Sequence, residues 1–188
     1  DLSSSQVFGR GYTVTPTEMD MDMNMFGVMY APTDKLTLMA MANYTFKSMD
    51  HRINPGAPAM LFNAVGGDTF TTESDGFGGI KIQALYRVYH EEQTKAHVGL
   101  GLSLPTGSID EKDKTPRPGM PPTFTENLLP ASMQLGSGTF DLLPQATLLQ
   151  DWKQFSLGLQ ANGVIRLESE NSNGYRLGNE FDVVGWGG

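Results

Sequence analysis

The chain has 188 residues, 22 of them glycine, a net charge of -8 and no cysteine. An acidic chain lacks the basic surface that nucleic acid requires, and a chain without cysteine has no disulfides or thiolate metal ligands. Its apolar runs are all shorter than the roughly 18 residues that indicate a transmembrane helix. The length allows one domain, residues 1–188, or a piece of a larger protein.

Residues 19–47 alternate between apolar and polar side chains, and this pattern predicts a hairpin of two long strands because successive strand residues face opposite sides. The turn is expected at 32–34, around Pro32. The first strand carries a row of methionines on one parity: Met19, Met21, Met23, Met25 and Met29. The acids Asp20 and Asp22 hold the other parity and must face water, so we expect the methionine row to face away from water.

Further strands are predicted at 79–89, 96–104, 139–150, 154–167 and 178–187, with an optional strand at 7–14. Residues 1–18, 49–78, 105–138 and 168–175 are rich in Gly, Pro and small polar side chains, and are expected to be loops. Short turns at 32–34, 90–95 and 151–153 then alternate with the longer connections. Outer-membrane barrels have this asymmetry, with short turns at one end and long outer loops at the other.

One parity of each strand is apolar, while the other is too hydrophilic for a dry core. We therefore expect an antiparallel up-and-down transmembrane β-barrel, and a soluble β-barrel or sandwich is the alternative. The polar parity gives the predicted pore lining: Asp20, Asp22, Asn24, Lys47, Lys81, Gln83, Arg87, Asp141, Gln160, Asn162, Arg166, Glu180 and Asp182. Near the short-turn end the same parity gives an apolar part of the lumen: Phe26, Tyr30, Met39, Leu85 and Trp186.

Several stretches resemble a family of Gram-negative outer-membrane β-barrel "transporter" proteins, akin to the putative outer-membrane proteins of the phenol meta-cleavage pathway. They are MYAPTDKLTLMAM (29–41), KSMDH (47–51), SLPTGSIDEKD (103–113), MQLGSGTFDLLP (133–144) and IRLESENSNGYRLGN (165–179). The resemblance implies residence in the cell outer membrane. Family members are longer, so seven or eight strands here imply an incomplete portion of a larger barrel. A complete eight-stranded barrel that uses residues 7–14 is the alternative.

The methionines also raise the possibility of a soft-metal site, because thioethers select Cu(I). Met39 and Met41 have the parity of the lumen, and Met49 and His51 form a Met-x-His pair; these four are the metal candidates. If the methionine row faces lipid, no metal is bound, and this is the reading we favour.

No nucleophile–base arrangement or dinucleotide motif is present, so we expect neither enzymatic activity nor a cofactor. The expected function is a passive channel for small, hydrophobic or aromatic solutes, with the lipid bilayer and the solute as partners. A structural or adhesive barrel that acts through its long loops is the second candidate, and a copper-handling barrel the third. Association with a second copy or with other envelope components stays open.

Overall fold

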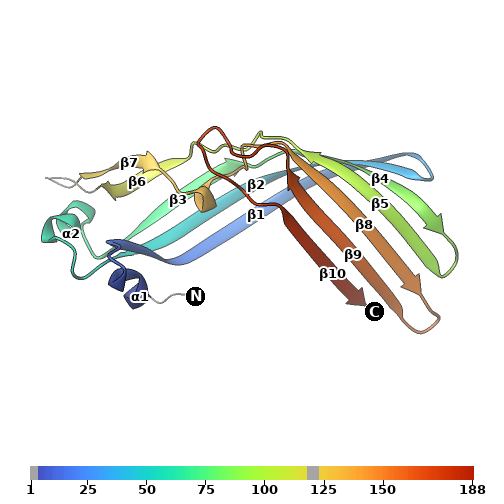
Figure 1. The fold of residues 1–188 in the computed structure, drawn as a ribbon, viewed down its shortest axis with the longest axis horizontal. Coiled ribbons are helices and arrows are strands. Elements are labelled where there is room, and N and C mark those ends of the chain that lie inside the picture. The colour runs from blue at the N-terminus through green and yellow to red at the C-terminus, as the bar shows by residue number, and fades with distance from the viewer. Residues whose placement is uncertain (1–3, 118–122) are drawn as a thin grey trace. The chain divides into compact units, whose positions relative to one another are not determined.

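The computed structural model describes residues 4–117 and 123–188, and it is all-β (Figure 1). The strands are β1 (Val14–Thr33), β2 (Leu36–Ile53), β3 (Thr69–Phe77), β4 (Lys81–His90), β5 (Thr94–Ser103), β6 (Lys112–Arg117), β7 (Thr123–Leu128), β8 (Asp141–Asp151), β9 (Ser156–Arg166) and β10 (Glu180–Gly187). The helices α1 (Ser4–Gly9) and α2 (Ala59–Val65) and the 3-10 turn η1 (Ala131–Met133) are short. Within the described ranges, no helix combines the length and apolar character needed to cross a membrane.

Contacts within the chain gather in two compact units. Unit 1 consists of Asp1–Asn24, Tyr44–Gly76 and Ser108–Leu135, and unit 2 of Met25–Asn43, Phe77–Gly107 and Gly136–Gly188. Strands β1 and β2 therefore contribute residues to both units.

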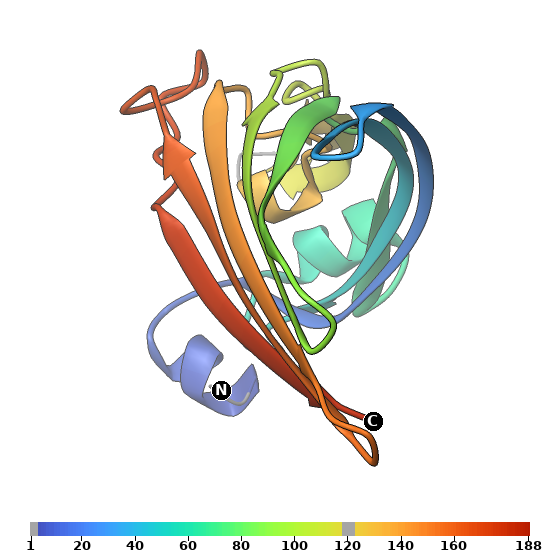
Figure 2. The ribbon, with the colours of Figure 1, turned by 90° about the vertical axis from the view of Figure 1, so that its right-hand side faces the viewer.

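Unit 2 is a curled antiparallel sheet, half of a barrel in form (Figure 2). Its strand order is β1-β2-β4-β5-β8-β9-β10, so strands that follow one another along the sheet also follow one another along this part of the chain. The predicted up-and-down antiparallel arrangement is confirmed. Strands β1 and β10 are the two ends of this order.

The predicted short turns are also confirmed, with shifts of a few residues. They lie at 34–35, 91–93 and 152–155. The Thr33 hydroxyl accepts from the Leu36 amide over 3.1 Å, the Glu91 amide donates to the Thr94 carbonyl over 2.9 Å, and the Trp152 amide donates to the Phe155 carbonyl over 2.8 Å. Each turn thus closes on its own hydrogen bond.

The prediction of loops is wrong over much of the four segments to which it was applied. Residues 49–78 contain the end of β2, α2 and β3, and 105–138 contain β6, β7 and η1. Residues 1–18 contain α1 and the start of β1, with no strand at 7–14. These elements are short, and Thr72 and Ser74 are the buried side chains of β3, so no apolar alternation marks that strand. Parts of the predicted loops, residues 1–3 and 118–122, lie outside the described residues.

Unit 1 has a small core in which Met49, Leu129 and Met133 pack together. The Lys47 ammonium ties η1 and the residues after it to β2, donating to the carbonyls of Ser132 over 2.8 Å and Gln134 over 2.6 Å. Burial lowers the pKa of Lys47. The Ser74 hydroxyl adds a 2.6 Å bond to the Met133 carbonyl, so the 131–135 segment is held by polar contacts as well as by its core side chains.

The pairing of β9 with β10 brings the Trp186 indole directly over Gly158. A Cβ at Gly158 would lie 2.1 Å from the ring, whereas a Cβ at Gly185, also at this strand pair, would have its nearest neighbour at 3.8 Å. We expect Gly158→Ala to destabilise the sheet by about 1–3 kcal/mol through overpacking. Its Trp186 fluorescence should shift when measured in a Trp152→Phe background. Gly185→Ala is the matched control, and equal behaviour of the two variants would contradict the packing.

Candidate functional site on the polar face of the sheet

The cross-strand register of unit 2 sorts its side chains onto two faces. One row runs Ala40–Ile82–Leu102–Leu142–Ile165, and the next runs Leu38–Ala84–Leu100. On the other side one row runs Met41–Lys81–Ser103–Asp141–Arg166, and another runs Thr37–Leu85–Gly99–Gln145–Asn162–Asp182. We call these sides the apolar face and the polar face.

Many large side chains of the apolar face are exposed, among them Ile165 at 41%, Leu100 at 55% and Phe181 at 76%, whereas Leu102 and Leu142 are half-buried. Polar-face residues of the inner strands, such as Gln83, Gln145 and Asn162, are half-buried, and Asp141 and Ser103 are buried. The two faces thus reverse the usual preference of a water-soluble sheet, which buries its apolar side.

Arg166 is the centre of the best-connected polar cluster. Its guanidinium donates to Asp141 over 2.6 Å and to Glu180 over 2.6 Å, and the side chains of Arg166 and Asp141 are only 12% and 3% exposed. Asp141 also accepts from the hydroxyls of Thr139 over 2.7 Å and Ser137 over 3.1 Å. The ring of donors compensates the cost of burying the Asp141 carboxylate.

Other polar side chains of this face are hydrogen-bonded to one another, two pairs across neighbouring strands and one pair, Gln160 and Asn162, within β9. Gln83 donates to Gln145 over 2.7 Å. Asn162 accepts from Gln160 over 2.8 Å and donates to Asp182 over 2.7 Å. These bonds connect amide and carboxylate side chains along the sheet. The side chains of the polar face are therefore held in place by hydrogen bonds to one another.

Most predicted pore-lining residues fall together on this face. They are Lys81, Gln83, Arg87, Asp141, Gln160, Asn162, Arg166, Glu180 and Asp182, with Met39, Leu85 and Trp186 from the apolar part of the predicted lumen. Gly99, Gly101 and Gly158 lie among them, and an added Cβ there would approach a neighbouring atom to 2.6, 2.9 and 2.1 Å. Such crowding is expected on the concave side of a curled sheet.

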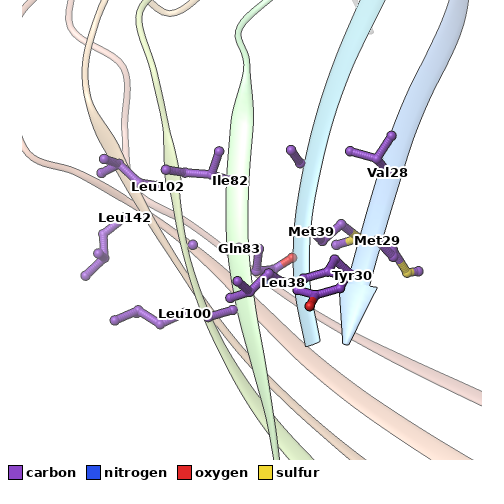
Figure 3. A pocket seen from close by; sticks show the side chains of 13 residues that line it. Val28, Met29, Tyr30, Leu38, Met39, Ile82, Gln83, Leu100, Leu102 and Leu142 are labelled. Carbon is purple, nitrogen blue, oxygen red and sulfur yellow. The ribbon is translucent and has the colours of Figure 1, made fainter. Parts of the chain in front are cut away.

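Strand β1 faces the opposite way from the prediction. A Cβ at Gly27 would lie 3.5 Å from Met41 Cγ, so odd residues of β1 share the polar face with Met39 and Met41. An apolar hollow of about 710 Å³ lies here, and residues of both parities touch it, among them Val28, Met29, Tyr30, Leu38, Met39, Ile82, Gln83 and Leu100. In Figure 3, Val28 and Ile82 project from the other side of the strands than Met29 and Met39. The expected face of Phe26 and Tyr30 is corrected accordingly: both belong to the apolar face.

The remaining predicted lining residues, Asp20, Asp22, Asn24 and Lys47, belong to unit 1. Asp20 and Asp22 share a hollow of about 200 Å³ with Phe46, Ser48 and the acids Glu73 and Asp75. The Tyr44 hydroxyl donates to Asp75 over 2.5 Å, and this bond raises the pKa of Tyr44. This part of unit 1 is therefore strongly acidic.

The Met-x-His pair also lies in unit 1. Met49 is in the core, and the His51 ring stacks on Phe70 with ring centroids 4.7 Å apart. Throughout the described part of the chain, no group of three or more His, Asp or Glu side chains is arranged to hold a metal ion.

Sequence reasoning missed the bulge in β4. The register against β5 shifts between Arg87 and Tyr89, so Tyr89 pairs with Ala96 and joins the apolar face. It also missed the hydroxyls of Ser137 and Thr139 that support Asp141. The Ser-Gly-Thr-Phe-Asp run could have signalled them, because hydroxyls two and four residues before a carboxylate often bond to it locally.

Comparison with known proteins adds no assignment, since no family model and no curated protein matches the chain significantly. The functional argument therefore depends on the two faces of unit 2.

Removing the Arg166 guanidinium should leave Asp141 buried without its counter-ion. We expect Arg166→Ala to lower the free energy of unfolding by about 3 kcal/mol or more, as for other broken buried pairs. Glu180→Gln removes only the exposed partner and should cost about 1 kcal/mol or less. Urea unfolding followed by the β-sheet circular dichroism signal would measure both, and similar small losses would contradict the central role of Arg166.

The His51 imidazole should make unit 1 sensitive to acid. Burial lowers the pKa of His51, and the Met49 and Phe70 carbonyls and the Asp50 charge oppose that effect only in part. A basic group with a lowered folded-state pKa stabilises the fold above its unfolded pKa, about 6.5, and loses that contribution as pH falls through this value. The protection factors of β2 and β3 amides, obtained by dividing out the intrinsic exchange rate at each pH, should fall below that pH, and His51→Asn should remove this part of the pH dependence.

Proposed function

We propose that unit 2 forms part of the wall of an outer-membrane β-barrel that conducts small hydrophobic or aromatic solutes. The observation that carries the proposal is the continuous, exposed apolar face of the sheet opposite a hydrogen-bonded polar face. Contiguous exposed apolar surface on this scale is unusual in a water-soluble monomer and favours contact with lipid or another apolar surface.

The strand dimensions support lipid as the surface that covers the apolar face. Strands β4 and β5 have 10 residues, and β8 and β9 have 11. A tilted transmembrane strand needs about 9–11 residues. Leu38, Ile82, Leu100, Leu148 and Leu159 would then face the hydrocarbon.

Exposed aromatic side chains near both ends of these strands also support a lipid-facing position for the apolar face. Tyr30, Tyr89, Trp152 and Phe155 lie near the short turns, and Phe77, Phe140 and Phe181 near the long connections. The Trp152 and Phe155 rings stack with centroids 4.5 Å apart. Aromatic girdles at the two interfaces are typical of outer-membrane barrels.

The polar face supports a graded lumen. The Arg166 cluster and Asp182 lie near the long-connection ends of β9 and β10, whereas Leu85, Leu149, Val184 and Trp186 lie toward the short turns. A conduit for salts has no need of the apolar part. Sites for small apolar molecules combine such a surface with a few polar groups, so we favour a hydrophobic or aromatic solute.

The proposal requires further strands beside β1 and β10, because an open edge is not tolerated in lipid. More chain or a second copy could supply them. A structural or adhesive barrel remains the second candidate, since β6, β7 and α2 in unit 1 form ordered structure within the long connections.

Two neighbouring positions of β8 test the lipid-facing assignment. Leu148 is on the apolar face with 47% of its surface exposed, and Thr147 is on the polar face. We expect Leu148→Arg to impair insertion into liposomes, at a cost of about 2–4 kcal/mol near the bilayer midplane. Thr147→Arg at the same depth should insert normally. If the apolar face met water, Leu148→Arg would be a harmless surface change, and equal insertion of both variants would remove the membrane proposal.

Conduction is tested separately with inserted protein. Liposome swelling should show faster entry of small aromatic solutes than of sugars, and planar bilayers should show little salt conductance. Insertion without flux of any solute would favour the structural or adhesive barrel, and strong ion conductance would exclude the preference for hydrophobic solutes.

A further inference from the structure

The reversed face of β1 places methionine side chains of two adjacent strands together in unit 2. Met25 and Met29 of β1 have the same parity as Gly27, whose side-chain position lies against Met41 of β2. Antiparallel pairing carried on from Gly27 and Met41 puts Met29 opposite Met39. Methionine thus occupies both sides of this strand pair on the polar face.

The spacing lets three thioethers converge. Directly opposed residues of an antiparallel pair have Cβ atoms about 4.5–5.5 Å apart, and diagonal neighbours lie within reach of long side chains at about 7–8 Å. Met29 and Met39 are such a direct pair, and Met41 is diagonal to Met29. Figure 3 shows Met29 and Met39 on the same side of β1 and β2. Gly27 has no side chain, and Met41 Cγ lies 3.5 Å from where its Cβ would stand, so Met41 packs across this position toward β1.

The chemistry of this cluster is selective. Thioether sulfur is uncharged, soft and polarisable, and it suits Cu(I) rather than hard cations. The cross-strand neighbours on β4 are Gln83 opposite Met39 and Lys81 opposite Met41. Neither is a carboxylate, and the Lys81 charge disfavours divalent cations further. Met29 has 67% of its surface exposed, so an ion could reach its sulfur.

We propose that Met29, Met39 and Met41 form a binding site for a soft monovalent cation, Cu(I) or Ag(I), on the polar face of unit 2, beside Gly27. The site binds the ion through three neutral sulfurs and involves no electron transfer. It does not depend on the channel function, because the site lies within one strand pair and can be tested with the detergent-solubilised chain.

The test is titration of the purified full chain with Ag(I), and with Cu(I) under anaerobic reducing conditions, against a chromophoric Cu(I) chelator. We expect one ion per chain, shifts of the Met29, Met39 and Met41 methyl resonances, and a sulfur-only first shell in X-ray absorption. Zn(II) should cause none of these changes. Absence of Cu(I) and Ag(I) binding at micromolar protein would overturn the proposal.

Conservative variants separate this site from the other methionines. Leu preserves size and apolar character, so the Met29→Leu, Met39→Leu, Met41→Leu triple variant should fold and lose the ion. Met60→Leu, on α2 in unit 1, is the matched control and should bind as the unchanged chain does. Retained binding in the triple variant would assign the ion to other sulfurs and contradict the site.

Two further variants leave every sulfur in place. Gly27→Val fills the space beside Met41 without a severe clash, since its Cβ would meet Met41 Cγ at 3.5 Å. It should weaken binding. Lys81→Gln removes the positive charge opposite Met41 and should strengthen binding. Unchanged affinity in both would show that the ion lies elsewhere, whatever the outcome of the channel assays.

Discussion

The continuous cross-strand register of unit 2 is the constraint on which the other features depend. A strand exposes alternate residues to opposite sides, so a slip of one position would exchange the two faces of that strand. From β2 to β10 the register keeps Ile82, Leu102, Leu142 and Ile165 in one row and Lys81, Ser103, Asp141 and Arg166 in the next. The buried Asp141–Arg166 pair reinforces that register, because a slipped β9 would leave the carboxylate without its counter-ion.

The strands β2, β4, β5, β8, β9 and β10 and their short turns were predictable from the sequence because their alternation is strong and each turn is short, and their faces follow parity except beyond the bulge at Tyr89. Leu100, Gln145 and Asn162 lie on the faces that their parity indicates. The structure within 49–78 and 105–138 was not predictable in the same way. Strand β3 buries Thr72 and Ser74, and α2 has seven residues, so neither carries an apolar pattern long enough to recognise.

The face of β1 in unit 2 is set by residues after Asn24, not by the acids that precede it. The prediction that the methionine row faces away from water rests on Asp20 and Asp22, which hold the opposite parity. Both acids belong to unit 1, whereas the β1 residues of unit 2 begin at Met25. In that second half the even parity holds Phe26, Val28 and Tyr30, which suit an apolar face better than Met25, Gly27 and Met29 do. The two halves of β1 share one alternation of faces, but the even positions are acidic in the first half and apolar in the second.

The face on which a methionine of β1 or β2 lies decides what its side chain can do. On an apolar face a methionine is one apolar residue among many, and leucine could replace it without consequence. On the polar face it lies beside Gln83 and Lys81, where a chain that needed only water-compatible side chains would carry polar residues. Glycine at position 27 lets Met41 pack closely against β1, with Met41 Cγ 3.5 Å from where a Cβ would stand, although a glycine inside a strand costs conformational entropy. Three thioethers of two adjacent strands therefore lie together on the face that also carries Gln83 and Lys81, and their soft, uncharged sulfurs set this part of the face apart chemically from the Arg166 cluster.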